Sequence, residues 1–172
     1  MSSAGSTATI FLQLSCGGRA VAGDGVAQGY ERQIAIERCS WSSGAEHRAI
    51  GRDLRTTLWH GQLRLGKRFD RASTALYGHM RNHDRIDSAR LTLLDAGAGQ
   101  GPAQTLAELQ LVDCFIDAIA TRASDAGVAM QVDEDIALSF ASGLLRYYPL
   151  SQPGAIRSAP TEYRIPPSRT HG

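Results

Sequence analysis

The chain has 172 residues, of which 42% are hydrophobic and 20% charged, and its formal net charge is +1. This length suits one domain with a tail or long loops, and would be cramped for two packed domains. The near-neutral charge gives no sign of a nucleic-acid partner. No window approaches the roughly 20 apolar residues of a membrane span, so we predict no membrane insertion.

The N-terminal residues lack the basic segment and long apolar core of a secretory signal, so we expect synthesis in the cytoplasm. The three cysteines are odd in number and none lies in a C-x-x-C pair. We therefore expect reduced, mostly buried thiols at Cys16, Cys39 and Cys114, and neither a disulfide framework nor a zinc knuckle.

The first third of the chain predicts two short strands and two connections. Residues 8–14 (ATIFLQL) are apolar and rich in strand formers, and residues 33–42 (QIAIERCSWS) place Ile34, Ile36 and Trp41 on an apolar face. Five glycines in residues 16–30 predict an exposed loop between these strands. Residues 42–57 show no sustained period and are long for a hairpin connection, so we expect a functional or mobile loop.

Residues 63–94 are the central segment of the predicted fold, and their pattern predicts a strand, a capped helix and a second strand. The apolar positions are two apart in the strands and four apart in the helix: Leu63, Leu65, Ala72, Leu76, Met80, Ala89, Leu91 and Leu93. Ser73 is the predicted N-cap, and the helix is predicted to end at Asn82. One short helix cannot form a layer of its own, so it must cover one end of a barrel or sandwich.

The longest ambiguous segment is residues 106–122 (LAELQLVDCFIDAIATR). As a strand, its apolar face changes near Leu111 and Val112, whereas a spacing of three to four residues and good helix formers fit a helix equally well. Both readings stay open on the residues alone. A glycine-dense hairpin tip is predicted before this segment, at residues 95–103, and a polar turn after it, at residues 123–129.

The last predicted strand begins at residues 133–135, and its apolar positions are Ile136, Leu138 and Phe140. Gly143 is predicted to form a bulge. Residues 151–172 contain four prolines and little apolar content, which predicts a tail and not an element of the fold.

Three patterns resemble chemical sites, and each has a more ordinary reading. Residues 61–68 nearly match the phosphate-loop pattern G-x-x-x-x-G-K-S/T, but Arg68 stands where a hydroxyl must bind Mg²⁺. His79 and His83 could hold a metal with Asp84 if the helix continued, but it is predicted to end first. Residues 133–135 are acidic, and we interpret them as a solvated turn that keeps the next strand from pairing with another copy.

Taken together, four segments resemble the haemolysin-coregulated protein (Hcp) family, whose members form the inner tube of type VI secretion systems. They are residues 36–42 (IERCSWS), 65–82 (LGKRFDRASTALYGHMRN), 89–95 (ARLTLLD) and 132–150 (VDEDIALSFASGLLRYYPL). The match covers residues 8–150. The chain departs from the family pattern at Arg146 before the aromatic pair Tyr147–Tyr148, and in a tail that lacks the common Gly-Trp.

The resemblance implies a mainly β fold: a small two-sheet β-barrel with one short α-helix, forming hexameric rings that stack into a tube. It implies a long bent strand at residues 106–122, a barrel domain at residues 1–150 and a proline-rich tail at 151–172. The segment 42–57 corresponds to the family's extended loop, and Ser40 to a lumen-facing serine that holds small effector proteins. The ring-stacking residues implied in that loop are Gly44, His47, Arg48, Arg52 and Arg55.

We therefore predict a non-enzymatic tube subunit, without cofactor or metal, that is exported by the type VI machine. The implied partners are copies of itself, spike, sheath and baseplate proteins, and small effectors in the lumen. One alternative is a monomeric β-barrel that binds a small ligand, which needs a closed barrel with an open apolar interior. Another is a small hydrolase that uses Cys39 or Cys114 with His60 or His79.

Overall fold

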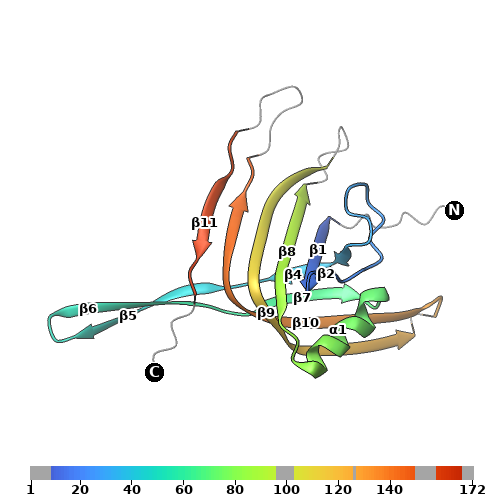
Figure 1. Ribbon diagram of the computed structural model, residues 1–172, viewed down its shortest axis with the longest axis horizontal. Coiled ribbons are helices and arrows are strands. Elements are labelled where there is room, and N and C mark those ends of the chain that lie inside the picture. Colours follow the sequence, from blue (N-terminus) through green and yellow to red (C-terminus); the bar gives the residue numbers. More distant parts are fainter. Residues whose placement is uncertain (1–8, 96–102, 126, 150–157, 168–172) are drawn as a thin grey trace.

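A computed structural model describes residues 9–95, 103–125, 127–149 and 158–167. These residues form a mainly β protein with one helix (Figure 1). The strands are β1 (Ile10–Cys16), β2 (Arg19–Ala20), β3 (Ile34–Ile36), β4 (Arg38–Ser40), β5 (Ser43–Ile50), β6 (Asp53–His60), β7 (Leu63–Arg68), β8 (Ile86–Asp95), β9 (Gln104–Asp125), β10 (Met130–Tyr147) and β11 (Thr161–Ile165). The helix is α1 (Arg71–Asn82).

The long hairpin of β9 and β10 is the backbone of the fold, and it settles the open choice at residues 106–122 in favour of a strand. Both strands bend sharply, so that one arm runs beside β8 and β11 and the other beside β7 (Figure 1). The buried face of β9 changes between Leu111 and Cys114, as predicted, because Val112 and Asp113 both face solvent and Asp113 has φ of 52°. The bend therefore lets one strand bury opposite faces in its two arms.

The bulge in this hairpin lies elsewhere than predicted. The register shifts between Ala137 and Leu138, which pair with Ala118 and Ile116. Gly143 pairs regularly with Leu111, so the prediction of a bulge there is wrong. A glycine is needed at Gly143 because an added Cβ would lie 2.7 Å from the Leu111 side chain and 2.8 Å from the Gln110 carbonyl oxygen.

The main sheet has the order β2-β1-β8-β9-β10-β7-β4, with β3 on β1 and β11 on β10, and β5 and β6 form a separate two-stranded sheet. The main sheet does not close into a barrel, so that part of the expected fold is wrong. The segment that could close it is split: β3 pairs with β1, β4 pairs with β7, and the two short strands are separated at Glu37.

One hydrophobic core fills the inside of the bend. Across β1, β8 and β9, the fully buried Leu12, Leu91 and Leu109 are aligned in register. From the other arm, Leu63 and Leu138 are paired and belong to the same cluster. Ala72 and Leu76 of α1 also join this cluster, so the helix covers part of the core as the sequence predicted.

The N-cap of the helix lies three residues earlier than predicted. Asp70 is the N-cap, and its side chain accepts a hydrogen bond from the Ala72 N–H at 3.0 Å. Ser73, the predicted cap, is the other half of a capping box, because its hydroxyl accepts from the Asp70 N–H at 3.0 Å. The helix ends at Asn82 as predicted, and His83 follows in the left-handed conformation with φ of 54°.

A buried ion network attaches the helix to the sheet. The Lys67 ammonium, fully buried, lies 2.8 Å from Glu134 Oε2 and 2.7 Å from Asp70 Oδ1, and donates to Ser73 Oγ at 2.9 Å. Ser73 in turn donates to Glu134 at 2.7 Å. The interpretation of residues 133–135 as a solvated turn is wrong, because all three lie within strand β10 and Glu134 is 1% exposed and neutralises the lysine.

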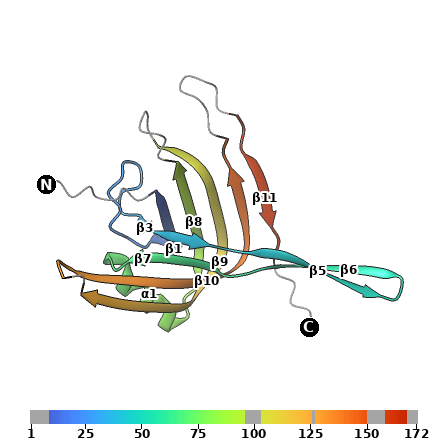
Figure 2. The same cartoon turned by 180° about the vertical axis from the view of Figure 1, so that it is seen from behind.

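Two predictions for irregular segments are also corrected. Residues 42–57 are not an irregular loop, because β5 and β6 form a hairpin that extends away from the rest of the molecule (Figure 2). The C-terminal segment contributes β11, which pairs with β10 from Gly143 to Tyr147 and is tied to it by Arg146 Nε, 2.6 Å from Glu162 Oε1. The predicted hairpin tip at residues 95–103 lies mostly outside the described residues.

Two glycines make a matched test of this packing. Replacing Gly143 with alanine is expected to lower the free energy of unfolding by about 1–3 kcal/mol, because the new methyl group has no room. Replacing Gly78 of α1, where a Cβ meets nothing within 4 Å, is expected to raise it by about 0.5–1 kcal/mol. Urea unfolding of both variants at one protein concentration measures the difference, and equal effects would contradict the packing described.

Candidate assembly surfaces

The β5–β6 hairpin has one apolar face. Its register pairs Ala45 with Leu58 and Ala49 with Leu54, and side chains two apart on a strand share a face. Leu54 is 68% exposed and Leu58 is 52% exposed. Between these apolar pairs the His47 ring nitrogen Nδ1 lies 2.9 Å from the Thr56 hydroxyl.

The opposite face of the hairpin is mixed: it carries the charged Glu46, Arg48, Asp53 and Arg55, and also the exposed apolar side chains of Ile50 and Trp59. Arg48 and Arg55 stand directly opposite each other, and like charges in such a pair destabilise a hairpin. Arg52 is in the turn after Gly51, which has φ of +64°. At the base, the Trp59 ring lies so close to Gly44 that any Cβ there would meet it at 2.6 Å. A two-stranded hairpin is marginal by itself, and this one exposes large apolar side chains, which makes it a candidate assembly surface.

Ser40 lies on an open sheet face of a different character. It is exposed at the end of β4, and the cross-strand register aligns it with Arg64, Ala137 and Ala118. The residues of this row and of the neighbouring cross-strand rows form the lining of a hollow of about 580 Å³. Its lining mixes small residues with charged ones, and Arg38 is paired to Asp135 while Arg122 lies 3.0 Å from the same carboxylate.

Most of the other candidate residues have structural roles. Residues 63–68 of the near phosphate loop are strand β7, and its lysine, Lys67, belongs to the buried ion network. His83 caps the helix, while His79 Nδ1 lies 2.8 Å from Asp84 Oδ2. His60, one candidate base, is stacked on Phe140 with ring centroids 4.3 Å apart.

The thiols are free, and only Cys114 is fully buried; Cys16 and Cys39 are half-buried. Burial, assisted by the Asp113 carboxylate, raises the pKa of the Cys114 thiol to about 12. Burial also raises the pKa of Cys39. These shifts oppose the thiolate that a nucleophile needs, and so weigh against the hydrolase alternative.

The cysteine environments predict an order of reactivity. At pH 8.5 the folded protein is expected to be alkylated at Cys16 and Cys39 before Cys114, which reacts only after unfolding. Because the raised pKa keeps Cys114 protonated in the folded state, its contribution to stability should fall as pH rises from about 9 towards 12. Mass spectrometry of alkylated peptides measures the order, and early labelling of Cys114 in the folded protein would contradict it.

Among the described residues, no helix is long and apolar enough to cross a membrane. The fold itself has known counterparts. A variant of the Hcp1 protein from E. coli EAEC 042 has a TM-score of 0.71 at 17% identity, covering 90% of this chain and 97% of that one. A type VI secretion system effector from Yersinia pestis has a TM-score of 0.64 at 15% identity, covering 91% and 99%. Hcp1 from Salmonella typhimurium has a TM-score of 0.63 at 18% identity, covering 91% and 95%.

These similarities define the class: the chain has the fold of type VI secretion system proteins. No curated protein matches the chain. The family described as "Type VI secretion system effector, Hcp" matches residues 11–147. The chain belongs to this Hcp family and is a tube protein of a type VI secretion system, as the resemblance implied.

Proposed function

We propose that six copies of this chain form a ring, and that rings stack into a tube through the β5–β6 hairpin. The observation that carries the stacking is the uncovered apolar face of that hairpin, with Leu54 and Leu58 more than half exposed. When two different surfaces of one subunit bind each other through a rotation that closes, the subunits form a ring. The two faces of that ring can then bind further rings along its axis. Gly44, His47, Arg48, Arg52 and Arg55 are the hairpin residues proposed to lie at the contact between rings.

The like-charged pair Arg48–Arg55 supports the same assignment. A repulsive pair on a surface hairpin is relieved when a carboxylate from another molecule lies between the two guanidinium groups. We propose that the neighbouring ring supplies this anion. The contact would then be apolar on one face of the hairpin and ionic on the other.

Ser40 and the small residues around it are proposed to face the bore of the ring. Small side chains leave room for cargo, and Arg64, which has no ion-pair partner among the described residues, offers a hydrogen-bond donor. The cargo would be small effector proteins, exported with the tube when the machine contracts. Spike, sheath and baseplate proteins would be the other partners, and the chain would act without enzymatic activity.

The lumen assignment predicts a selective defect. Replacing Ser40 with glutamine should leave the ring intact, seen as particles with a central opening in negative-stain electron microscopy. It should reduce the effectors that co-purify from cells with a working machine. The control is Ser43→Gln, which changes an exposed serine at the start of the hairpin. Solid or irregular particles from the unmodified chain would contradict the ring, whereas equal cargo in both variants would contradict only the role of Ser40.

A further inference from the structure

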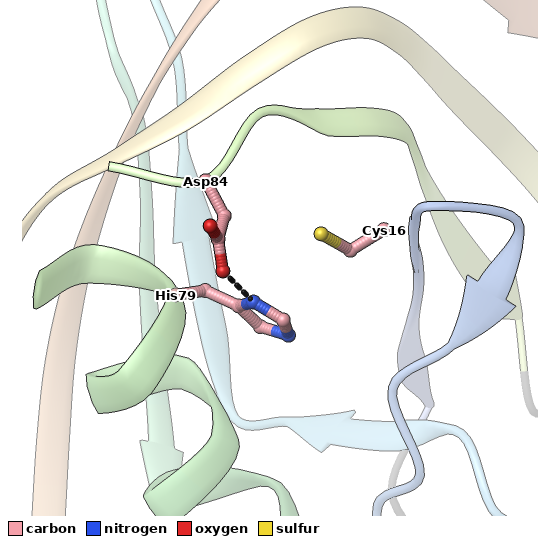
Figure 3. Close-up of side chains that lie close together, drawn as sticks. All are labelled: Cys16, His79 and Asp84. Carbon is pink, nitrogen blue, oxygen red and sulfur yellow. Dashed lines mark hydrogen bonds and ion pairs between the residues drawn. The ribbon is translucent and has the colours of Figure 1, made fainter. Parts of the chain in front are cut away.

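Three side chains with metal-binding atoms come together away from the proposed assembly surfaces. Cys16 is the last residue of β1, His79 is in the last turn of α1, and Asp84 lies between α1 and β8. In Figure 3 the three side chains converge on one space, and their ligand atoms all lie within 4.8 Å of one another. All three residues are half-buried, so a small ion could reach them from solvent.

The helix end holds His79 and Asp84 in place. The Asp84 N–H donates to the His79 carbonyl oxygen at 3.0 Å, which fixes the turn that brings both side chains together. The His79 ring nitrogen Nδ1 then lies 2.8 Å from Asp84 Oδ2. This contact holds the imidazole and the carboxylate side by side, within reach of one ion.

Cys16 is positioned from the other side. Its thiol donates to the Arg85 carbonyl oxygen at 3.4 Å, and the next turn is tied down where the Gly18 N–H donates to Asp87 Oδ2 at 3.2 Å. The thiol is therefore held beside the segment that carries Asp84. The donors come from parts of the chain more than 60 residues apart: His79 and Asp84 are held by a local hydrogen bond, and Cys16 by a long-range one to Arg85.

We propose that Cys16, His79 and Asp84 bind a divalent transition-metal ion of the zinc type, with solvent completing the coordination. A thiolate, an imidazole and a carboxylate are all zinc ligands, with bonds of about 2.0–2.3 Å that put donor atoms about 3.5 Å apart in a tetrahedron. The observed separations bracket that spacing, with 2.8 Å between His79 Nδ1 and Asp84 Oδ2 and at most 4.8 Å between any two of the ligand atoms. On binding, the thiol releases its proton to solvent, and the ion takes the place of the hydrogen bond between His79 and Asp84.

A catalytic triad is the competing interpretation of Cys, His and Asp, and it fits less well. A catalytic cysteine needs an electropositive surrounding, whereas the Cys16 thiol lies beside the carboxylates of Asp84 and Asp87. The same negative charge favours a bound cation. None of the three hollows described is lined by Cys16, His79 or Asp84.

Cobalt(II) titration tests the site through its spectrum. The untagged full chain, reduced and freed of metal with a chelator, is titrated with Co²⁺ at pH 7.5. We expect a near-ultraviolet thiolate-to-cobalt charge-transfer band that Zn²⁺ then removes by displacement. In Cys16→Ser the band should disappear, and in His79→Gln the affinity should fall by more than about 100-fold, because loss of an outer-shell partner alone costs about 10- to 100-fold.

Cys39→Ser is the matched control, since it removes a half-buried cysteine that is not part of the cluster, and it should keep the band and the affinity. Circular dichroism of each variant confirms that it is folded. The proposal is overturned if the unmodified chain gives no band at excess Co²⁺, or if the band survives in Cys16→Ser. Neither result bears on ring formation, so the metal site and the proposed function fail separately.

Discussion

The variant Lys67→Met is expected to lower the free energy of unfolding by about 3–5 kcal/mol, because it leaves buried carboxylates without their counter-charge. Glu134 is 1% exposed, and the Asp70 side chain is 11% exposed. Methionine fills the space of the lysine stem but supplies no hydrogen-bond donor. Urea unfolding at matched chain concentration measures the effect, since assembly would also add to apparent stability.

The neighbouring pair Arg68–Glu37 provides the control. It is similar in chemistry, with Nε 2.9 Å from Oε1, but its side chains are 65% and 45% exposed. Arg68→Met is therefore expected to cost at most about 1 kcal/mol. A second arm, Lys67→Met with Glu134→Leu, should recover part of the loss, because removing both buried charges relieves the desolvation penalty. Equal losses in Lys67→Met and Arg68→Met would contradict a stabilising role for the buried network.

The variant Leu54→Glu is expected to abolish stacking of rings without unfolding the chain. Leu54 is 68% exposed on a hairpin outside the core, so the fold does not depend on it. If stacking buries Leu54, the substitution removes about 1.5–3 kcal/mol of binding free energy from each contact between subunits of neighbouring rings, and this loss is repeated in every subunit of the ring. Sedimentation velocity should then show single rings where the unmodified chain forms heavier species.

Leu54→Met keeps the apolar contact and is the matched control, expected to stack like the unmodified chain. If Leu54→Glu also stacks like the unmodified chain, the apolar face of the hairpin is not the contact between rings. If it falls to single chains, the hairpin holds the ring itself together, which would also contradict the proposed division of surfaces.

Local patterns predicted the elements whose side chains alternate or repeat between solvent and core. The helix, with its end at Asn82 but not its start, and the paired apolar positions of β7, β8 and β10 followed from periods of four and two. The bend of β9 was visible in the change of face at Leu111 and Val112. The residues alone could not decide between strand and helix in this segment. The choice depends on pairing with β8 and β10, and β8 lies earlier in the sequence while β10 follows only after the turn.

The β5–β6 hairpin was missed because it has no buried face to create a strong pattern. Its only signals were the alternation of Leu54, Thr56 and Leu58 and the two residues Gly51 and Arg52 between the strands. Likewise, β11 was hidden by a proline-rich surrounding sequence. A segment without a buried face leaves a weak pattern in a single chain.

The buried charges and the Cys16 cluster were missed for a different reason. The acidic triplet was interpreted as solvated and no partner was predicted for Lys67, because burial of a charge depends on a partner that sequence does not place nearby. His79 and Asp84 could be paired by their spacing, but Cys16 joins them only through the contact of β1 with the helix end. Such clusters follow from tertiary packing and not from local period.

The native mass of the purified chain tests the central claim most directly, that this protein is a subunit built to be repeated around a bore. Size-exclusion chromatography with light scattering at micromolar concentration should give six times the 18.5 kDa of one chain, or a multiple of that ring. A mass that stays at 18.5 kDa across the concentration range would contradict the account.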